Sequence, residues 1–206
     1  MSDTSSIKPR TLGPWPGLRS ALVSGILLVL ILWAHPLHAL DIDPELRERM
    51  LTAVNDSSSF QDEYDAQVWL AAMLDRLGED ARGDHDRALH ILRAAHREAA
   101  RAKLPPGLVL AVMEVESRFD PFAWSHSGAV GLMQVMPFWL HELKLSDANL
   151  FEIDINLRMG CTILRYYLDM EKGNVDRALA RYNGSLGKTV YPDKVNKALK
   201  RRWSDA

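Results

Sequence analysis

Beyond residue 39 the chain places its apolar residues at helical spacing in one segment after another, and this periodicity constrains the fold most. No window alternates apolar and polar residues for long enough to make a convincing strand. Asp84 and Asn174 stand where helix starts are needed, and Gly173 stands where a helix should end. We therefore predict a mainly α fold with little or no sheet. The predicted helices cover residues 43–55, 60–77, 85–102, 108–119, 154–172, 175–182 and 192–203.

The first 39 residues have the pattern of a secretory signal peptide. Basic residues and prolines in residues 1–20 precede an apolar run over 21–34, and the small residue Ala39 follows. The run is shorter than the ~20 residues that span a bilayer, which favours cleavage after Ala39. Leu37 is larger than the residue usually found two positions before the cut, so an uncleaved membrane anchor stays the alternative. In either case the rest of the chain is predicted to be exported.

Charge, cysteine and histidine content exclude several kinds of site. The chain carries 25 Lys and Arg against 27 Asp and Glu, and loss of residues 1–39 leaves 22 against 26, a net charge of −4. This balance offers no basic surface for nucleic acid. Cys161 is the single cysteine, so an intramolecular disulfide is excluded, and we expect it to pack in the core. The spacing of His85, His90 and His96 does not suit a zinc site, so no metal or cofactor is predicted.

One glutamate stands out on the helix predicted over Leu108–Phe119, which follows Pro105-Pro106. At about 100° per residue, with Leu108 at zero in the apolar stripe, Glu116 lies at roughly 80°, at the border of the stripe and in the last turn. Glu114 lies roughly 240° round the same wheel and is predicted to face solvent. A carboxyl group against apolar neighbours has a raised pKa and can hold a proton near neutral pH, as a general acid must. On this pattern alone, an ordinary structural charge stays the alternative for Glu116.

The loop after this helix, residues 120–137, combines small residues with aromatic ones. Gly128 and Gly131 allow the backbone to pass close to a neighbour, either the preceding helix or a ligand. Trp124 beside Ser125 fits a sugar site, where an aromatic face stacks on a ring and a hydroxyl group orients it. A core or lid aromatic is the alternative for Trp124.

These motifs together resemble one family. They are Glu116-Ser117, Phe119-Asp120-Pro121, Ala123, Ser125, Gly128-Ala129, and Gly131-Leu132-Met133-Gln134-Val135-Met136-Pro137. The pattern resembles the soluble-type lytic transglycosylases, lysozyme-like enzymes that cleave bacterial peptidoglycan. The segments around Asn149-Leu150-Phe151 and Tyr182-Asn183 extend the resemblance, which covers roughly residues 100–200. The family usually continues Tyr-Asn with Ala-Gly-Pro-Gly, whereas this chain has Gly184-Ser185-Leu186-Gly187.

The resemblance implies a lysozyme-like helical catalytic domain over residues 100–206, preceded by an N-terminal helical region over 40–99 and the signal segment over 1–39. It implies cleavage of the β-1,4 bond between N-acetylmuramic acid and N-acetylglucosamine, with a 1,6-anhydromuramoyl product. Glu116 would be the single catalytic acid and base. The expected substrate-binding residues are Ser125, Gln134, Met136, Tyr182, Asn183 and Trp124, with Tyr182 forming hydrogen bonds near the glutamate.

Two other functions stay open at this point: a lysozyme-like hydrolase and a catalytically weak peptidoglycan-binding module. Asp120 lies four residues beyond Glu116, but at a helix end before a proline it is expected to cap the turn. The expected partners are peptidoglycan glycan strands, with no nucleic acid, and a membrane only if the N-terminal segment is retained. We expect a monomer in the periplasm or cell envelope of a bacterium.

Overall fold

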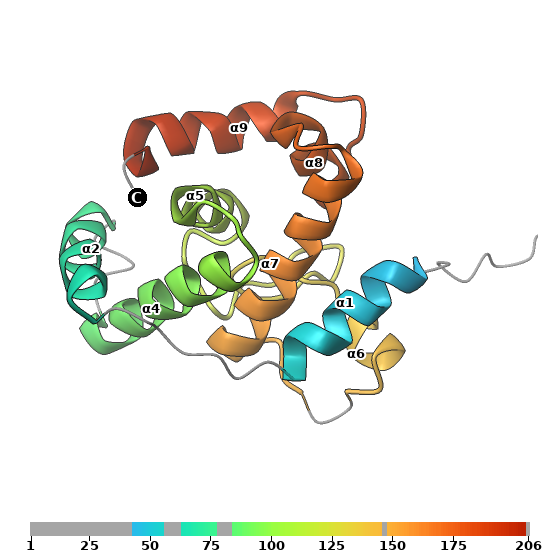
Figure 1. The fold of residues 1–206 in the computed structure, drawn as a ribbon, viewed down its shortest axis with the longest axis horizontal. Helices are drawn as coiled ribbons and strands as arrows, with labels where there is room; N and C mark the ends of the chain where they lie inside the picture. The colour runs from blue at the N-terminus through green and yellow to red at the C-terminus, as the bar shows by residue number, and fades with distance from the viewer. Residues whose placement is uncertain (1–42, 56–62, 78–83, 146–147, 205–206) are drawn as a thin grey trace, which may run out of the picture. The chain divides into compact units, whose positions relative to one another are not determined.

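A computed structural model describes residues 43–55, 63–77, 84–145 and 148–204, and the predicted signal segment lies outside these ranges. The helices are α1 Pro44–Asn55, α2 Glu63–Arg76, α4 His85–Arg101, α5 Pro106–Glu116, α6 Phe138–Glu142, α7 Ile153–Met170, α8 Val175–Tyr182 and α9 Val190–Ala198, followed by the π-helical turn η1 Leu199–Trp203 (Figure 1). Within these ranges the only β-type pairing is at two isolated bridges, Trp124 with Val130 and Val130 with Val135. The prediction of a mainly α fold is confirmed. No described helix is long and apolar enough to cross a membrane.

The residues predicted to begin and end helices do so in the structure. The Asp84 side chain accepts a hydrogen bond from the backbone N–H of Arg87 at 3.0 Å and so caps α4. Asn174 caps α8 in the same way. Gly173 adopts a φ of +83°, and its N–H donates to the Leu168 carbonyl at 2.8 Å, which ends α7. The short helix α6 was not predicted.

Helix α5 ends three residues earlier than predicted, at Glu116. Ser117 is its C-terminal cap, and Arg118 and Phe119 both have positive φ values of 54° and 66°. The chain therefore turns sharply at this point, and Glu116 is the last residue of the helix, directly before the loop.

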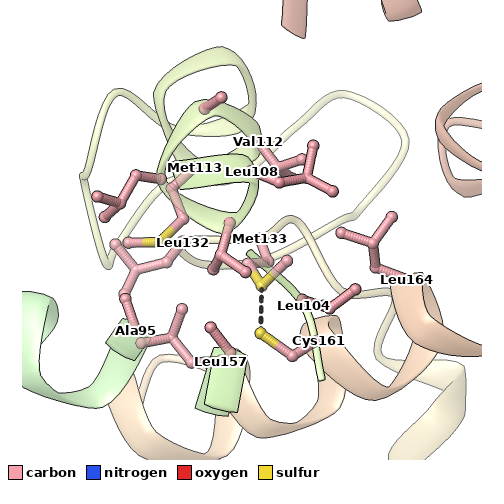
Figure 2. Close-up of a cluster of buried hydrophobic side chains, with 14 of the residues drawn as sticks. Ala95, Leu104, Leu108, Val112, Met113, Leu132, Met133, Leu157, Cys161 and Leu164 are labelled. Atoms are coloured by element: carbon pink, nitrogen blue, oxygen red, sulfur yellow. Dashed lines mark hydrogen bonds between the residues drawn. The ribbon is translucent and has the colours of Figure 1, made fainter. Parts of the chain in front are cut away.

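The core surrounds α5, and residues 107–113 of this helix are all buried. Figure 1 shows α5 nearly end-on between α4 and α9, both of which it contacts. Apolar side chains of α5, of the following loop and of α7 meet beneath it, as Figure 2 shows. Cys161 is fully buried there, with its thiol 3.8 Å from the sulfur of Met133, and burial raises the pKa of that thiol. The prediction that Cys161 packs in the core is confirmed.

Asn156 of α7 fastens the loop over residues 117–137 to the core. Its side-chain oxygen accepts from the N–H of Met133 at 2.8 Å, and its amide donates to the carbonyls of Val130 at 2.8 Å and Leu150 at 2.9 Å. At the start of the loop the Ser117 hydroxyl donates to the Leu132 carbonyl at 2.8 Å. These buried bonds hold the loop in one conformation, since each group would otherwise lose its partner away from water.

Gly131 fits closely against this anchor, and we expect Gly131→Ala to destabilise the fold strongly. An added Cβ would lie 2.3 Å from the Asn156 amide nitrogen and 2.7 Å from the Leu150 carbonyl oxygen, at a φ of +77°. The protein neighbours of this glycine are thus Asn156 and Leu150, and not the α5 helix. Crowding and backbone strain together should cost about 3 kcal/mol of unfolding free energy, measured in urea.

Gly128→Ala is the matched control for that substitution. Gly128 has a similar φ of +85°, but nothing lies within 4 Å of an added Cβ. Only the backbone cost of about 1–2 kcal/mol should remain. Equal losses in the two variants would show that contact with Asn156 does not require a glycine at position 131.

Glu114 does not face solvent, contrary to the helical-wheel prediction. Its carboxylate accepts a hydrogen bond from the indole N–H of Trp203 at 2.7 Å and pairs with Arg201, and its side chain is only 14% exposed. The helical wheel predicted that this side of α5 is open to solvent, but η1 packs on it and covers it. Glu114 therefore ties the C-terminal turn to α5.

Glu98 forms a buried ionic cluster between α4 and α7. Its side chain is 0% exposed, and it accepts hydrogen bonds from Arg101 at 2.6 Å and Arg158 at 3.0 Å. Burial acts to raise the pKa of Glu98, but the two arginines outweigh it and hold the pKa below its ordinary value. The carboxylate is therefore charged in the folded protein and links the two helices.

Candidate active site

Glu116 lies at the wall of a hollow of about 440 Å³, which we call the main hollow. Its lining comes from the end of α5, the following loop with the start of α6, helix α7, and the end of α8 with the two residues after it. Five of the six predicted substrate-binding residues line it together with the glutamate: Ser125, Gln134, Met136, Tyr182 and Asn183. The fold thus brings residues from distant parts of the segment 116–184 together around this hollow.

The Glu116 carboxyl group has a raised pKa. Burial is the main cause, because water that would stabilise the charged form is excluded. A hydrogen bond from the Tyr191 hydroxyl, 2.6 Å from Oε1, acts in the opposite direction but does not cancel the effect of burial. The group can therefore hold a proton closer to neutral pH than an exposed glutamate can, which is the property of a general acid.

Sequence reasoning missed Tyr191. This residue belongs to α9, is 7% exposed and lies 75 positions after Glu116 in the chain. No local pattern marks it, since it is one of several tyrosines near helical segments. Only the packing of α9 on α5 brings its hydroxyl to the carboxyl group.

Tyr182 lines the main hollow together with Glu116, as the resemblance implied. Its hydroxyl donates to the backbone carbonyl of Met133 at 2.7 Å, whereas the hydrogen bond to the glutamate itself comes from Tyr191. Burial, and then the nearby Glu116 carboxylate, raise the pKa of Tyr182. Tyr182 therefore stays neutral and braces the loop that lines the hollow.

The loop side of the main hollow is held by its own polar groups. The amide of Gln134 donates to the carbonyls of Gly131 at 2.9 Å and Ala123 at 3.2 Å, which leaves its oxygen to accept from a ligand. The Ser125 hydroxyl accepts from the N–H of Ala129 at 2.9 Å. Both side chains are thus fixed before any ligand arrives.

Trp124 is not among the residues that line the main hollow. It is 70% exposed and lies against Phe151, with ring centres 6.2 Å apart. Ser125 lines the main hollow, whereas its neighbour Trp124 lies exposed beside Phe151.

A second hollow of about 260 Å³, which we call the side hollow, shares Glu116 and Asn183 with the main one. The glutamate therefore lies where the two hollows meet. An extended ligand that occupied both hollows would pass directly beside its carboxyl group. Among the described residues that line either hollow, Glu116 is the only carboxylate. Asp120 lines neither, and its side chain accepts from the N–H of Phe122 at 2.8 Å, which confirms that it caps the turn.

No cluster of histidine, cysteine and carboxylate side chains suited to a metal ion occurs in the described part of the chain. The chemistry that the residues of the two hollows themselves offer is transfer of a proton by one partly buried carboxyl group, that of Glu116.

Tyr191→Phe should raise the pKa of Glu116 further, because the hydroxyl group stabilises the charged carboxylate. A carboxyl 13C NMR titration of labelled protein measures this directly. Tyr166→Phe is the control, because its hydroxyl donates to Asp43 and should not affect the glutamate. An unchanged or lower pKa in the Tyr191 variant would contradict the assignment.

Comparison with known proteins places this site in a family. Residues 93–202 match the family model described as Transglycosylase SLT domain. Over 131 residues the chain is 32% identical to proteins called membrane-bound lytic murein transglycosylase C from Yersinia pestis strain Pestoides F and Yersinia pseudotuberculosis serotype O:1b. The matched region is 55% of this chain and 37% of each relative, so the chain spans little more than a third of their length. Since the family model covers more than half of the chain and includes the whole hollow, the chain belongs to the transglycosylase SLT domain family.

Proposed function

We propose that this protein is a peptidoglycan lytic transglycosylase. Its reaction would cleave the β-1,4 bond between N-acetylmuramic acid and N-acetylglucosamine and form a 1,6-anhydromuramoyl end. The single observation that carries the proposal is the partly buried Glu116 carboxyl group, with its raised pKa, at the junction of the two hollows. Family membership and the names of the relatives support the same substrate.

In the first step Glu116 acts as the acid. Its proton passes to the glycosidic oxygen, the bond from that oxygen to C1 of the muramic acid breaks, and the N-acetylglucosamine leaves as an alcohol. Positive charge develops at C1 while Glu116 becomes a carboxylate. The Tyr191 hydroxyl, already 2.6 Å from that carboxyl, stabilises the charge that forms there.

In the second step the same group acts as the base. The C6 hydroxyl of the muramic acid attacks C1, and its proton returns to Glu116, so the ring closes without water. Most glycosidases use a second carboxylate as nucleophile or base. Among the described residues that line the two hollows, Glu116 is the only carboxylate, and this favours a nucleophile supplied by the substrate.

The fixed polar groups of the main hollow would bind the sugars. Gln134 and Ser125 offer acceptor oxygens to hydroxyl and acetamido groups, and Met136, Tyr182 and Asn183 complete the surface. We retain Trp124 only as an outer contact for a longer strand, because it is exposed and does not line the main hollow.

The location of the protein is part of the proposal. We infer export to the bacterial envelope, with residues 1–39 as a signal peptide or an anchor, 40–99 as an N-terminal helical region and 100–206 as the catalytic domain. The relatives are named as membrane-bound proteins, which fits the envelope. We expect a monomer that acts on glycan strands.

Mass spectrometry of sacculi digested with the purified protein tests the function. Soluble fragments that end in 1,6-anhydromuramic acid are the expected products. Fragments with reducing ends alone would make the protein a hydrolase instead, since water would then have attacked C1. Binding to sacculi without released fragments would indicate a binding module.

A further inference from the structure

Two lysines line the side hollow beside Glu116. Lys188 lies in the turn after α8 and Lys194 lies on α9, and Ser185 and Tyr191 line the same hollow. Both lysines are exposed, and neither forms an ion pair with a described residue. Nearby arginines behave differently, because Arg177 and Arg181 are both held by Glu171. The two ammonium groups are therefore available to a ligand.

The lysines do not serve the Glu116 carboxyl group itself. A cation close to that carboxylate would lower its pKa, but the shift has only two causes, burial and the hydrogen bond from Tyr191. The two lysines therefore do not shift the pKa of Glu116. Their positive charge is available to a ligand in the side hollow.

The turn that presents Lys188 is well defined. The N–H of Ser185 donates to the Ala180 carbonyl at 2.7 Å, and the N–H of Lys188 donates to the Ser185 carbonyl at 2.9 Å. Gly184 and Gly187 provide the positive φ values, 68° and 88°, that this path needs. This turn includes residues 184–187, where the chain departs from the sequence usual in the family it resembles.

We propose that Lys188 and Lys194 form a subsite for the carboxylate groups of the peptides attached to the muramic acid. This inference rests on the proposed function, which brings the glycan strand past Glu116. A glycan backbone of N-acetylated sugars carries no charge, whereas its attached peptides end in and contain carboxylates. Two unpaired ammonium groups next to the scissile bond match that charge, and the hollow has room for it.

Binding to two kinds of sacculi tests the subsite. Glu116→Gln protein is used throughout, so that the substrate is not consumed, and the dissociation constant is measured by co-sedimentation. The ligands are native sacculi and sacculi whose carboxylates have been amidated. Native sacculi should bind about tenfold more tightly than amidated ones.

Adding Lys188→Gln and Lys194→Gln should abolish most of that preference, whereas arginine at both positions should retain it. Lys197→Gln with Lys200→Gln is the matched control, because it removes the same charge from exposed positions outside the hollow. The preference should also shrink as salt is added.

A preference that survives in the Lys188 and Lys194 glutamine variant, or falls equally in the control, would overturn the subsite. Equal binding of the starting protein to native and amidated sacculi would overturn it as well. Absence of anhydro products from the unaltered protein instead contradicts the proposed function, so the two failures are distinct.

Discussion

Glu116→Gln is expected to reduce the release of anhydro fragments by roughly a thousandfold or more. Glutamine has nearly the same shape but neither gives up nor takes a proton, so both the acid and the base step are lost. Turnover is measured by mass spectrometry of digested sacculi against unaltered protein. Binding to sacculi should persist, because the other groups that line the main hollow are unchanged.

The same substitution should not destabilise the fold, and the pH dependence of the free energy of unfolding shows in which direction it acts. Because the pKa of Glu116 is raised from its ordinary value of 4.5, the unfolded chain releases this proton at lower pH than the folded protein does. Folding stability therefore declines as pH rises from 4.5 through the folded pKa, and Glu116→Gln removes that decline. Its stability relative to the unaltered protein should grow with pH over this window.

Asp120→Asn is the control for activity, since that carboxylate only caps a turn outside the hollows. It should retain most of the turnover. Substantial activity in the Glu116 variant, or loss of activity only through unfolding seen by circular dichroism, would contradict a single acid and base at this position.

Glu98→Ala is expected to cause the largest loss of stability, about 3–5 kcal/mol. Removing this carboxylate leaves the guanidinium groups of Arg101 and Arg158 without their buried counter-charge between α4 and α7. For a domain of this size such a loss lowers the melting temperature by on the order of 10 °C. Urea and thermal unfolding followed by circular dichroism measure both quantities.

The pH dependence separates this effect from simple loss of packing. The pKa of Glu98 lies below its ordinary value of 4.5, so its charge stabilises the fold above that pH, and the contribution disappears as pH falls through the folded pKa. The difference between Glu98→Ala and the unaltered protein should therefore shrink in acid. The exposed Glu48→Ala is the control and should change stability by less than about 0.5 kcal/mol. A difference that is constant with pH would assign the loss to packing alone.

Local patterns in the sequence were enough to define most helices and the position of Glu116. Asp84, Gly173 and Asn174 end or begin helices through bonds to residues three to five positions away, which a linear pattern can contain. The border position of Glu116 likewise follows from the helical period. The end of α5 was misplaced by three residues, because the turn depends on how Ser117 is fixed to Leu132 in the loop.

The sequence by itself determined a helical family domain and the glutamate at the edge of its apolar stripe, because both depend on spacing within one segment. The tertiary structure alone decided that Tyr191 contacts Glu116, that Glu114 is covered by η1 and that Trp124 does not line the main hollow. These contacts join residues as far as 89 positions apart. Which faces of α5 are covered depends on the helices that pack around it, and a helical wheel drawn for one segment contains no information about its neighbours.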